Sequence, residues 1–156
     1  MVAIADVPLL APRDGLNYHA VQSVRVPAPM TAFEAWMRMQ DRPLPLLSLA
    51  FRVRDAISAR FGVKRIGGFS GNARPTSVVV GDHLDFFLVE DVRPDLLVLT
   101  ERDRHLDVMT CLSVDGQEVT VTSSVVVKNL FGRVYMIPVG LAHRVIVRAM
   151  LRRLTE

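Results

Sequence analysis

The sequence has few of the residues on which several common kinds of site depend. It contains one cysteine, Cys111, two lysines, and few aromatic residues, which make up 6% of its 156 residues. A single cysteine excludes an internal disulfide framework and a zinc site built from several cysteines, and it fits a reducing, cytoplasmic setting. Nucleic-acid-binding surfaces typically combine a concentrated stripe of lysine and arginine with aromatic side chains. We therefore expect no nucleic-acid partner, no cofactor and no metal.

Long apolar runs are missing as well. Residues 134–142 form one of the longest uncharged apolar runs, nine residues, whereas a helix that spans a membrane needs about 20. We therefore expect no transmembrane segment. Residues 1–12 are mildly apolar, but Asp6, Pro8 and Pro12 interrupt them and no basic residue precedes them, so they do not resemble a secretion signal.

The residues that are present indicate one globular domain. Hydrophobic residues make up 50% of the chain and charged residues 22%, which excludes disorder and predicts a sizeable core. We expect a lead-in over residues 1–16, ending at the Asp14-Gly15 turn signal, and a single domain over residues 17–156. The domain is expected to be a monomer or a homodimer.

Charge is distributed unevenly along the chain. The net charge is +3, but residues 38–74 carry eight basic and two acidic side chains, and residues 82–118 carry three basic and ten acidic ones. Residues 138–156 carry four arginines and one glutamate. We expect these basic and acidic elements to face each other or water within one fold.

The first third of the chain predicts one strand and two short helices. A loose alternation predicts a strand over residues 18–26, which Pro27 ends. Thr31 can cap a short helix, and Glu34, three residues later, completes a capping box. Apolar residues at helical spacing predict a second helix over residues 46–61, and a glycine-containing loop follows.

After this loop the apolar period changes from 3.6 residues to 2. This change predicts strands over residues 82–91, 96–101, 105–114, 118–128 and 133–137, with a further short strand over 76–80. The connections between successive strands are so short that they require hairpins, and hence an antiparallel meander. A long helix over residues 140–154 is expected to close the chain.

The alternation also predicts which side chains face the core. We expect the inner faces of three strands to meet the closing helix. These faces comprise Leu84, Phe86 and Leu88; Leu106, Val108, Thr110, Leu112 and Val114; and Val119, Val121, Ser123, Val125 and Val127. The inward stripe of the helix comprises Ala142, Val145, Ile146, Ala149 and Met150, and Arg144, Arg148 and Arg152 point the other way. The predicted fold is α+β, a curved antiparallel sheet wrapped around a long C-terminal helix, with two shorter helices after the first strand.

Three segments carry a resemblance to a known family. Residues 81–86 read Gly-Asp-His-Leu-Asp-Phe, residues 128–135 read Lys-Asn-Leu-Phe-Gly-Arg-Val-Tyr, and His143 opens an arginine-rich final helix. Over residues 17–154 the chain resembles an uncharacterised bacterial family, domain of unknown function 2867. It departs from the family at Leu141, where proline is usual two residues before the histidine.

The order of elements is similar to the helix-grip fold of START-like and birch-allergen-like proteins. That resemblance implies a cavity between sheet and helix, because members of this wider group bind lipids, hormones or polyketides there. Some of them catalyse cyclisation or dehydration. We expect this chain to bind an apolar or amphipathic small molecule, and the alternative is a cyclase-like or dehydratase-like enzyme that uses polar cavity groups for acid–base catalysis.

Nine residues are candidates for the cavity lining. Thr110, Ser123 and Tyr135 are the polar groups expected to face or edge this space, and Trp36 belongs to the core or to the cavity rim. The remaining candidates are Phe86, Leu112, Val145, Ala149 and Met150. No residue is assigned a catalytic role.

Other motifs are interpreted structurally. His83/Asp85 and His105/Asp107 each share a strand face, but leucines claim the core side, so we expect both pairs on the outer, solvated face and not at a metal. The glycines of residues 67–71 lack the Gly-Lys-Ser/Thr of a phosphate-binding loop. Cys111 is expected to be structural. His143 is expected to be neutral, because a helix N-terminus disfavours imidazolium.

Overall fold

The structure of this protein is a computed structural model that describes residues 7–41, 52, 75–84 and 87–156. Within these residues it contains two α-helices and six strands. The helices are α1 (Ala32–Met39) and α3 (Leu130–Arg152), with short 3₁₀ turns at Arg13–Gly15 and Arg153–Thr155. The strands are β1 (Tyr18–Arg25), β2 (His83–Leu84), β3 (Phe87–Arg93), β4 (Leu96–Arg102), β5 (Leu106–Asp115) and β6 (Glu118–Val127). Apart from residue 52, the predicted helix over residues 46–61 lies outside the described residues, as does most of the predicted loop after it.

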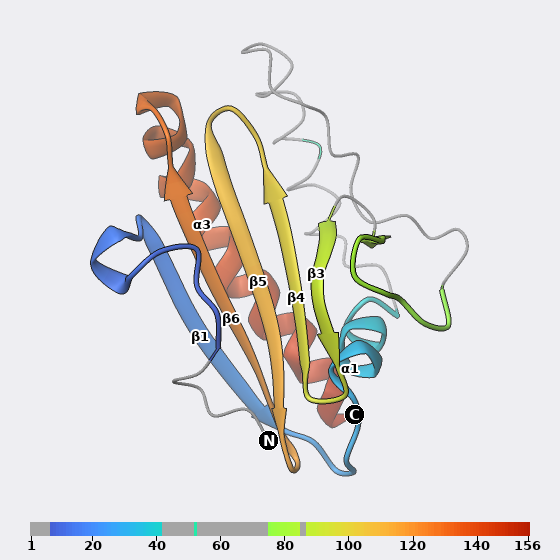
Figure 1. Ribbon diagram of the computed structural model, residues 1–156. Coiled ribbons are helices and arrows are strands. Elements are labelled where there is room, and N and C mark those ends of the chain that lie inside the picture. The colour runs from blue at the N-terminus through green and yellow to red at the C-terminus, as the bar shows by residue number, and fades with distance from the viewer. Residues whose placement is uncertain (1–6, 42–51, 53–74, 85–86) are drawn as a thin grey trace.

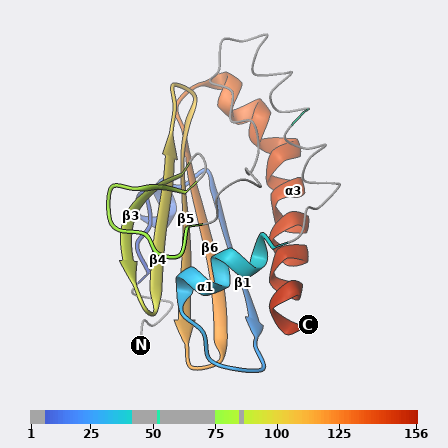
Figure 2. The ribbon, with the colours of Figure 1, turned by 90° about the vertical axis from the view of Figure 1, so that its right-hand side faces the viewer.

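The strands form one antiparallel sheet in the order β1-β6-β5-β4-β3-β2. The predicted meander is therefore confirmed for β3 to β6, and the N-terminal strand β1 joins it at the far side of β6. Helix α3 runs along one face of the curved sheet, and the short α1 lies on the same side (Figures 1 and 2). The α+β class and the sheet-plus-C-terminal-helix arrangement are thus as predicted.

The long hairpin of β5 and β6 shows why the alternation was informative. The two strands pair over their full length, from Leu106 opposite Val127 to Asp115 opposite Glu118. Gly116 makes the turn with φ +60°, a conformation that L side chains rarely adopt. Only Gly116 and Gln117 lie between the two strands, so the connection is a tight hairpin.

Apolar side chains gather on both faces of the sheet. The larger cluster lies between the sheet and the helices and contains Val89, Leu97, Leu99, Leu112, Val114, Val119, Val121, Val147, Met150, Leu151, Leu154 and residues of α1. The smaller cluster lies on the opposite face, where Val7 and Leu10 cover Leu96, Val98, Met109 and Cys111. The N-terminal lead-in therefore packs on the outer face of the sheet and shields it from water.

Helix α1 forms as the capping box predicts. Thr31 Oγ1 accepts a hydrogen bond from the Glu34 amide (3.1 Å), and a Glu34 carboxylate oxygen accepts one from the Thr31 amide (2.7 Å). Trp36, on the buried face of this helix, meets the ring of Phe87 edge-on with centroids 5.7 Å apart. This contact ties α1 to β3 within the larger cluster.

Helix α3 is longer than predicted. It begins at Leu130, so residues 133–137 are helical and the predicted strand there is wrong. Asn129 caps the helix by accepting from the Gly132 amide (3.0 Å), and Gly132 lies so near β5 that a Cβ atom would approach the His105 carbonyl oxygen to 2.6 Å. Pro138 lies inside the helix, where the packing against the sheet outweighs the backbone hydrogen bond that proline removes.

The segment before β4 also differs from its prediction. The described residues that form strand structure within the predicted strand 82–91 belong to two strands, because β2 pairs with β3 through His83 opposite Leu88 and Leu84 opposite Phe87. Leu84 and Phe87 are therefore paired neighbours, and both are buried. Leu88 is only partly buried, so the prediction that Leu84 and Leu88 share one inner face is wrong. Residues 76–80 contain no strand.

The face that α3 turns to the sheet differs from the predicted stripe. Its buried residues are Gly132, Gly140, Val147, Met150 and Leu151. Of the predicted stripe, Met150 is buried and Ile146 packs partly against the larger cluster, whereas Val145 is 62% exposed. The predicted helix lacks the first ten residues of α3. The side that faces the sheet was therefore inferred from the apolar residues of its second half alone.

One helical stretch in the described part of the chain, Leu130–Thr155, is long and apolar enough to cross a membrane by length and composition. The core helix of a soluble protein meets the same criterion. Here the residues of α3 that face the sheet belong to the main core.

Candidate functional site

The structure brings only some of the predicted cavity residues together. Trp36, Leu112 and Met150 belong to the single cluster between the sheet and the helices, and Leu112 has no exposed surface. Thr110 and Ser123 lie opposite each other on β5 and β6 and are both buried. These five residues line the core in the described structure.

The other four candidates lie elsewhere. Tyr135 is on the first half of α3, where its ring stacks on Phe131 with centroids 6.0 Å apart. Val145 faces away from the sheet, and Ala149 is half-buried. Phe86 lies outside the described residues.

A pocket of about 350 Å³ opens at the edge of the sheet, between β1 and the C-terminal half of α3. It is lined by Gln22, Ser23, Val24, Arg148, Leu151 and Arg152. None of these residues was predicted to line a cavity. The sequence did contain a signal for two of them. Arg148 and Arg152 lie four residues apart, so they share one side of the final helix and bring two positive charges together there.

The chemistry of this β1–α3 pocket is that of an amphipathic site. Val24 and Leu151 supply apolar wall, and both belong to or pack against the main core. Arg148 and Arg152 bring two guanidinium groups to the same wall, and neither makes an ion pair with any residue that the structure describes. Gln22 Nε2 donates to the Arg144 carbonyl (3.1 Å), which holds the strand and the helix at a fixed spacing.

A tyrosine–histidine pair fastens the same two elements one turn away. The Tyr18 hydroxyl lies 3.3 Å from both the Gly140 carbonyl oxygen and His143 Nδ1. The Arg144 guanidinium carbon lies 5.6 Å from the centre of the Tyr18 ring. Burial, with a smaller contribution from Arg144, lowers the pKa of His143 from 6.5 to about 4. His143 is therefore neutral near pH 7, as predicted, but burial and not a helix N-terminus is the cause.

The first turn of α3 encloses a buried histidine, His105. Asn129 Nδ2 donates to His105 Nδ1 (2.7 Å), and Phe131 covers the imidazole with ring centroids 4.6 Å apart. His105 is thus buried instead of solvated, which corrects the prediction for this histidine. The reason is that the strand begins at Leu106, so His105 belongs to the turn that meets α3.

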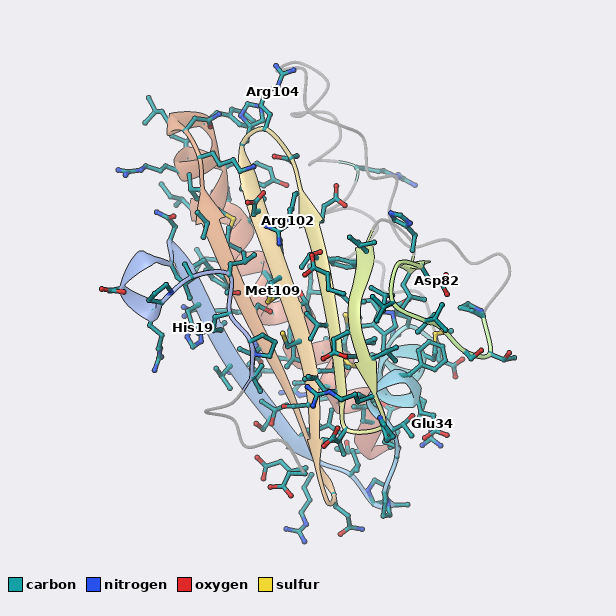
Figure 3. The ribbon with its side chains drawn as sticks, viewed as in Figure 1. His19, Glu34, Asp82, Arg102, Arg104 and Met109 are labelled. Carbon is teal, nitrogen blue, oxygen red and sulfur yellow. The ribbon has the colours of Figure 1, made fainter. Side chains whose placement is uncertain are left out.

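Polar side chains on the outer face of the sheet form a network around Asp107, near Arg102 (Figure 3). Asp107 pairs with Lys128 (2.9 Å) and Arg102 (3.5 Å), and Arg102 also reaches Glu90 (3.4 Å). Thr100 Oγ1 donates to the same glutamate (2.7 Å). Asp107 is thus paired with cations and not with His105, and the described residues hold no group of three or more metal-ligating side chains.

Cys111 occupies the outer face beneath the N-terminal segment, where it contacts the smaller apolar cluster. Its side chain is 1% exposed, and Sγ donates to the Pro8 carbonyl (3.4 Å). Burial, with a contribution from Glu90, raises the pKa of the thiol to about 12. A thiol in this position is structural, as predicted.

Comparison with known proteins identifies the family. Residues 13–150 match the model of a family described as "Protein of unknown function (DUF2867)". The chain belongs to the DUF2867 family. The matched range of this DUF2867 protein includes Gln22, Val24 and Arg148 of the β1–α3 pocket, and it ends just before Leu151 and Arg152.

Two solved structures are similar to this DUF2867 protein at low identity. One is hypothetical protein jhp0584 from Helicobacter pylori, with 15% identity, a TM-score of 0.44, and coverage of 99% of this chain and 97% of that chain. The other is a putative uncharacterized protein from Rhizobium leguminosarum, with 14% identity, a TM-score of 0.42, and coverage of 88% and 95%. No curated protein matches the sequence.

Proposed function

We propose that this DUF2867 protein binds an amphipathic small molecule with an anionic head in the pocket between β1 and α3. The observation that carries the proposal is the presence of two guanidinium groups, from Arg148 and Arg152, in a pocket whose other wall is partly apolar. A guanidinium group recognises carboxylate or phosphate through paired N–H donors. Val24 and Leu151 would contact the apolar part of the ligand.

The size and position of the pocket support this reading. A volume of about 350 Å³ falls at the lower end of the range for small-molecule sites, roughly 300–1,000 Å³. The residues predicted to line a central cavity, such as Leu112 and Met150, are instead packed in the core. The ligand would therefore lie at the edge of the sheet and not beneath its centre.

The arrangement also supports placing the fold in the START-like, helix-grip group. A long C-terminal helix packed along one face of a curved antiparallel sheet is the feature shared with that group (Figure 2). Ligand binding between the sheet and this helix is the property that the resemblance implies. We propose that this chain shares that property, with the site at the side of the helix next to β1.

An enzyme that works by acid–base catalysis is the alternative, and one observation favours it. Tyr18 and His143 form a half-buried pair of titratable groups on β1 and α3, the two elements that also line the pocket. However, the Tyr18 hydroxyl and the Gly140 carbonyl are also within hydrogen-bond distance (3.3 Å), so the pair fastens β1 to α3. Neither member lines the pocket, and we propose binding without chemistry.

Binding can be tested with an unbranched medium-chain fatty acid and the alcohol of the same length. We expect the acid to bind and to raise the melting temperature, because the unfolded chain has no pocket. The double variant Arg148→Ala/Arg152→Ala should lose at least about tenfold in affinity for the acid, since charge-assisted hydrogen bonds contribute roughly 1.5–3 kcal/mol each. Isothermal titration calorimetry provides the measurement.

The matched control is Arg133→Ala, which removes an exposed arginine from the same helix outside the pocket. It should leave the affinity for the acid unchanged. If the alcohol binds as tightly as the acid, or if Arg133→Ala weakens binding as much as the double variant, the anionic-head proposal is wrong. Absence of any thermal shift with either ligand would count against the pocket itself.

A further inference from the structure

The solvent-facing side of α3 carries an apolar stripe. Its residues recur every three or four positions, which places them on one side of a helix. They are Leu130 (75% exposed), Val134 (60%), Ile137 (69%), Leu141 (67%) and Val145 (62%). At 1.5 Å per residue the stripe extends for about 22 Å along the helix.

Arginines extend and flank this α3 stripe. Arg148 and Arg152 follow Val145 at the same helical spacing, and Arg133 and Arg144 lie beside the apolar residues on the same side of the helix. All four are exposed. Helix α3 contains no aspartate or glutamate, so the outer surface of the helix combines aliphatic side chains with positive charge alone.

We propose that this face of α3 docks on the surface of an anionic lipid bilayer, with the helix lying parallel to the membrane plane. Aliphatic side chains on such a face enter the boundary between headgroups and acyl chains, and flanking arginines bind the phosphates. The proposal goes beyond ligand binding in the β1–α3 pocket and does not depend on it. A docked orientation would place Arg148 and Arg152, and so the pocket, at the membrane surface.

The charge of the rest of the chain favours this occupant over the two nearest alternatives. A second copy of the chain, docked through the same face, would bring the arginines of two α3 helices together with no acidic partner on either helix. The second alternative is the basic segment 38–74 of the same chain. It carries eight basic and two acidic side chains, so its net charge has the same sign as this face of α3 and does not favour contact with it. An anionic surface is complementary to both basic segments.

The composition of the face and the shape of the fold point to lipid instead of protein. Protein interfaces are enriched in tyrosine, tryptophan and phenylalanine at their centres, whereas the stripe contains only leucine, isoleucine and valine. The sheet lies on the opposite side of the core from this face (Figure 2), and residues 82–118, which supply β2 to β5, carry ten acidic and three basic side chains. A basic helix side and an acidic sheet side would orient the molecule with α3 toward an anionic membrane.

Docking parallel to the surface also agrees better with the fold than a membrane-spanning helix. The inner side of α3 holds Val147, Met150 and Leu151 in the main core, so spanning would require the helix to leave the sheet. The outer side places two arginines in line with the apolar stripe, where a spanning helix would expose them to hydrocarbon. Surface docking requires neither change.

The test is co-sedimentation of the full chain with two kinds of vesicle, one of phosphatidylcholine alone and one of equal parts phosphatidylcholine and phosphatidylglycerol. We expect binding to the anionic vesicles that weakens as salt is added. Leu141→Asp should reduce this binding at least about tenfold, because it replaces an aliphatic side chain that would enter the bilayer with a negative charge that anionic lipids repel. Arg133→Ala should reduce it by about fivefold.

Each variant has a matched control. Val80→Asp introduces the same charge at an apolar residue of similar exposure (61%) before β2, away from the stripe. Arg93→Ala removes an exposed arginine at the β3–β4 turn. Both controls should bind the anionic vesicles as the parent protein does, and the melting temperature of every variant should show that it is folded.

Three results would overturn the proposal. The first is the absence of binding to the anionic vesicles. The second is binding that Leu141→Asp and Val80→Asp weaken equally, which would indicate a nonspecific effect of charge. The third is a dimer, measured by light scattering, that Leu141→Asp dissociates while the parent protein does not bind vesicles, which would make the stripe a contact between copies of the chain.

Discussion

His143 shows how burial determines the chemistry of a single residue in this fold. The residue lies on α3 within reach of the Tyr18 hydroxyl, and burial lowers its pKa to about 4. The unfolded chain leaves this histidine in water, where its pKa is near 6.5. Between these two values the unfolded state binds more protons than the folded state, so the free energy of unfolding must fall as the pH falls.

The predicted effect is full stability above about pH 6.5 and progressive loss toward pH 4, reaching at most about 3 kcal/mol from this one group. His143→Gln removes the titrating group and should flatten the dependence over this range. Urea unfolding of both proteins at about pH 7 and about pH 5 measures the difference. If the variant loses as much stability as the parent protein between these pH values, His143 is not the group responsible.

The same residue shows what could be predicted from one position. The neutral state of His143 was predicted from the sequence, but from a supposed position at a helix N-terminus. The actual cause could not be predicted, because the burial of His143 depends on packing against β1, and its contact Tyr18 lies 125 residues away in the sequence. Val145 was wrongly predicted to face the core for the same reason, because the sequence does not show which side of α3 meets the sheet.

At the level of the element, α3 depends on the asparagine that precedes it. Asn129 accepts from the Gly132 amide through Oδ1 and donates to His105 Nδ1 through its amide nitrogen. It therefore caps the helix and joins its first turn to the turn before β5. Gly132 then allows the helix to approach the His105 carbonyl more closely than any side chain would permit.

We predict that Asn129→Ala lowers the free energy of unfolding by about 2 kcal/mol, at the upper end for an N-cap, because it also removes the hydrogen bond to buried His105. Thr31→Ala, at the cap of the shorter α1, is the matched comparison and should cost about 1 kcal/mol. Denaturant titrations of the two variants and the parent protein measure both changes in the free energy of unfolding. Equal losses in the two variants would show that the Asn129–His105 contact adds nothing to capping.

Local signals predicted α1 but not the start of α3. The capping box of Thr31 and Glu34 is complete within four residues, so the sequence determines that helix start locally. Residues 133–137 contain β-branched and aromatic side chains before Pro138, a pattern that favours a strand ending at the proline. Close approach of Gly132 to the His105 carbonyl and burial of α3 against the sheet override that preference, and neither is visible in the local sequence.

At the level of the whole molecule, the N-terminal segment seals the outer face of the sheet. Val7 and Leu10 cover Met109 and Cys111, and the Pro8 carbonyl accepts from the thiol. Figure 3 shows Met109 on the side of the sheet that faces away from α3. Because Cys111 is the single cysteine, its reactivity reports whether this segment is in place.

Cys111 should therefore resist modification by Ellman's reagent in the folded protein, since it is buried and its pKa is raised to about 12. Removal of residues 1–12 should increase the rate by about tenfold or more without unfolding the sheet, as local exposure requires far less free energy than global unfolding. The variant Cys111→Ser/Val80→Cys supplies an exposed thiol as the fast reference. A truncated chain that reacts as slowly as the full chain would show that the sheet itself shields the thiol.

The architecture could be predicted further than the site. Hairpin lengths and alternation were enough for β4, β5 and β6, because each pairs with its neighbour in sequence. The pocket lies between β1 and α3, elements from opposite ends of the chain, and their spacing depends on contacts such as Gln22 with the Arg144 carbonyl. Arg148 and Arg152 were correctly placed away from the core, but the strand that they meet could not be inferred from the helix alone.

The pairing of β1 with β6 has a consequence for how the chain is made. Asn17 accepts a hydrogen bond from the Val127 amide, 110 residues further along the sequence, at the end of this ladder. A ribosome releases β1 well before β6, which is its neighbour in the sheet that the structure describes. We expect the β3–β6 meander to form first and β1 to dock late, so that the nascent chain carries an unpaired strand until β6 has emerged. The pocket on the β1 side of α3 is then completed only in the last step of folding.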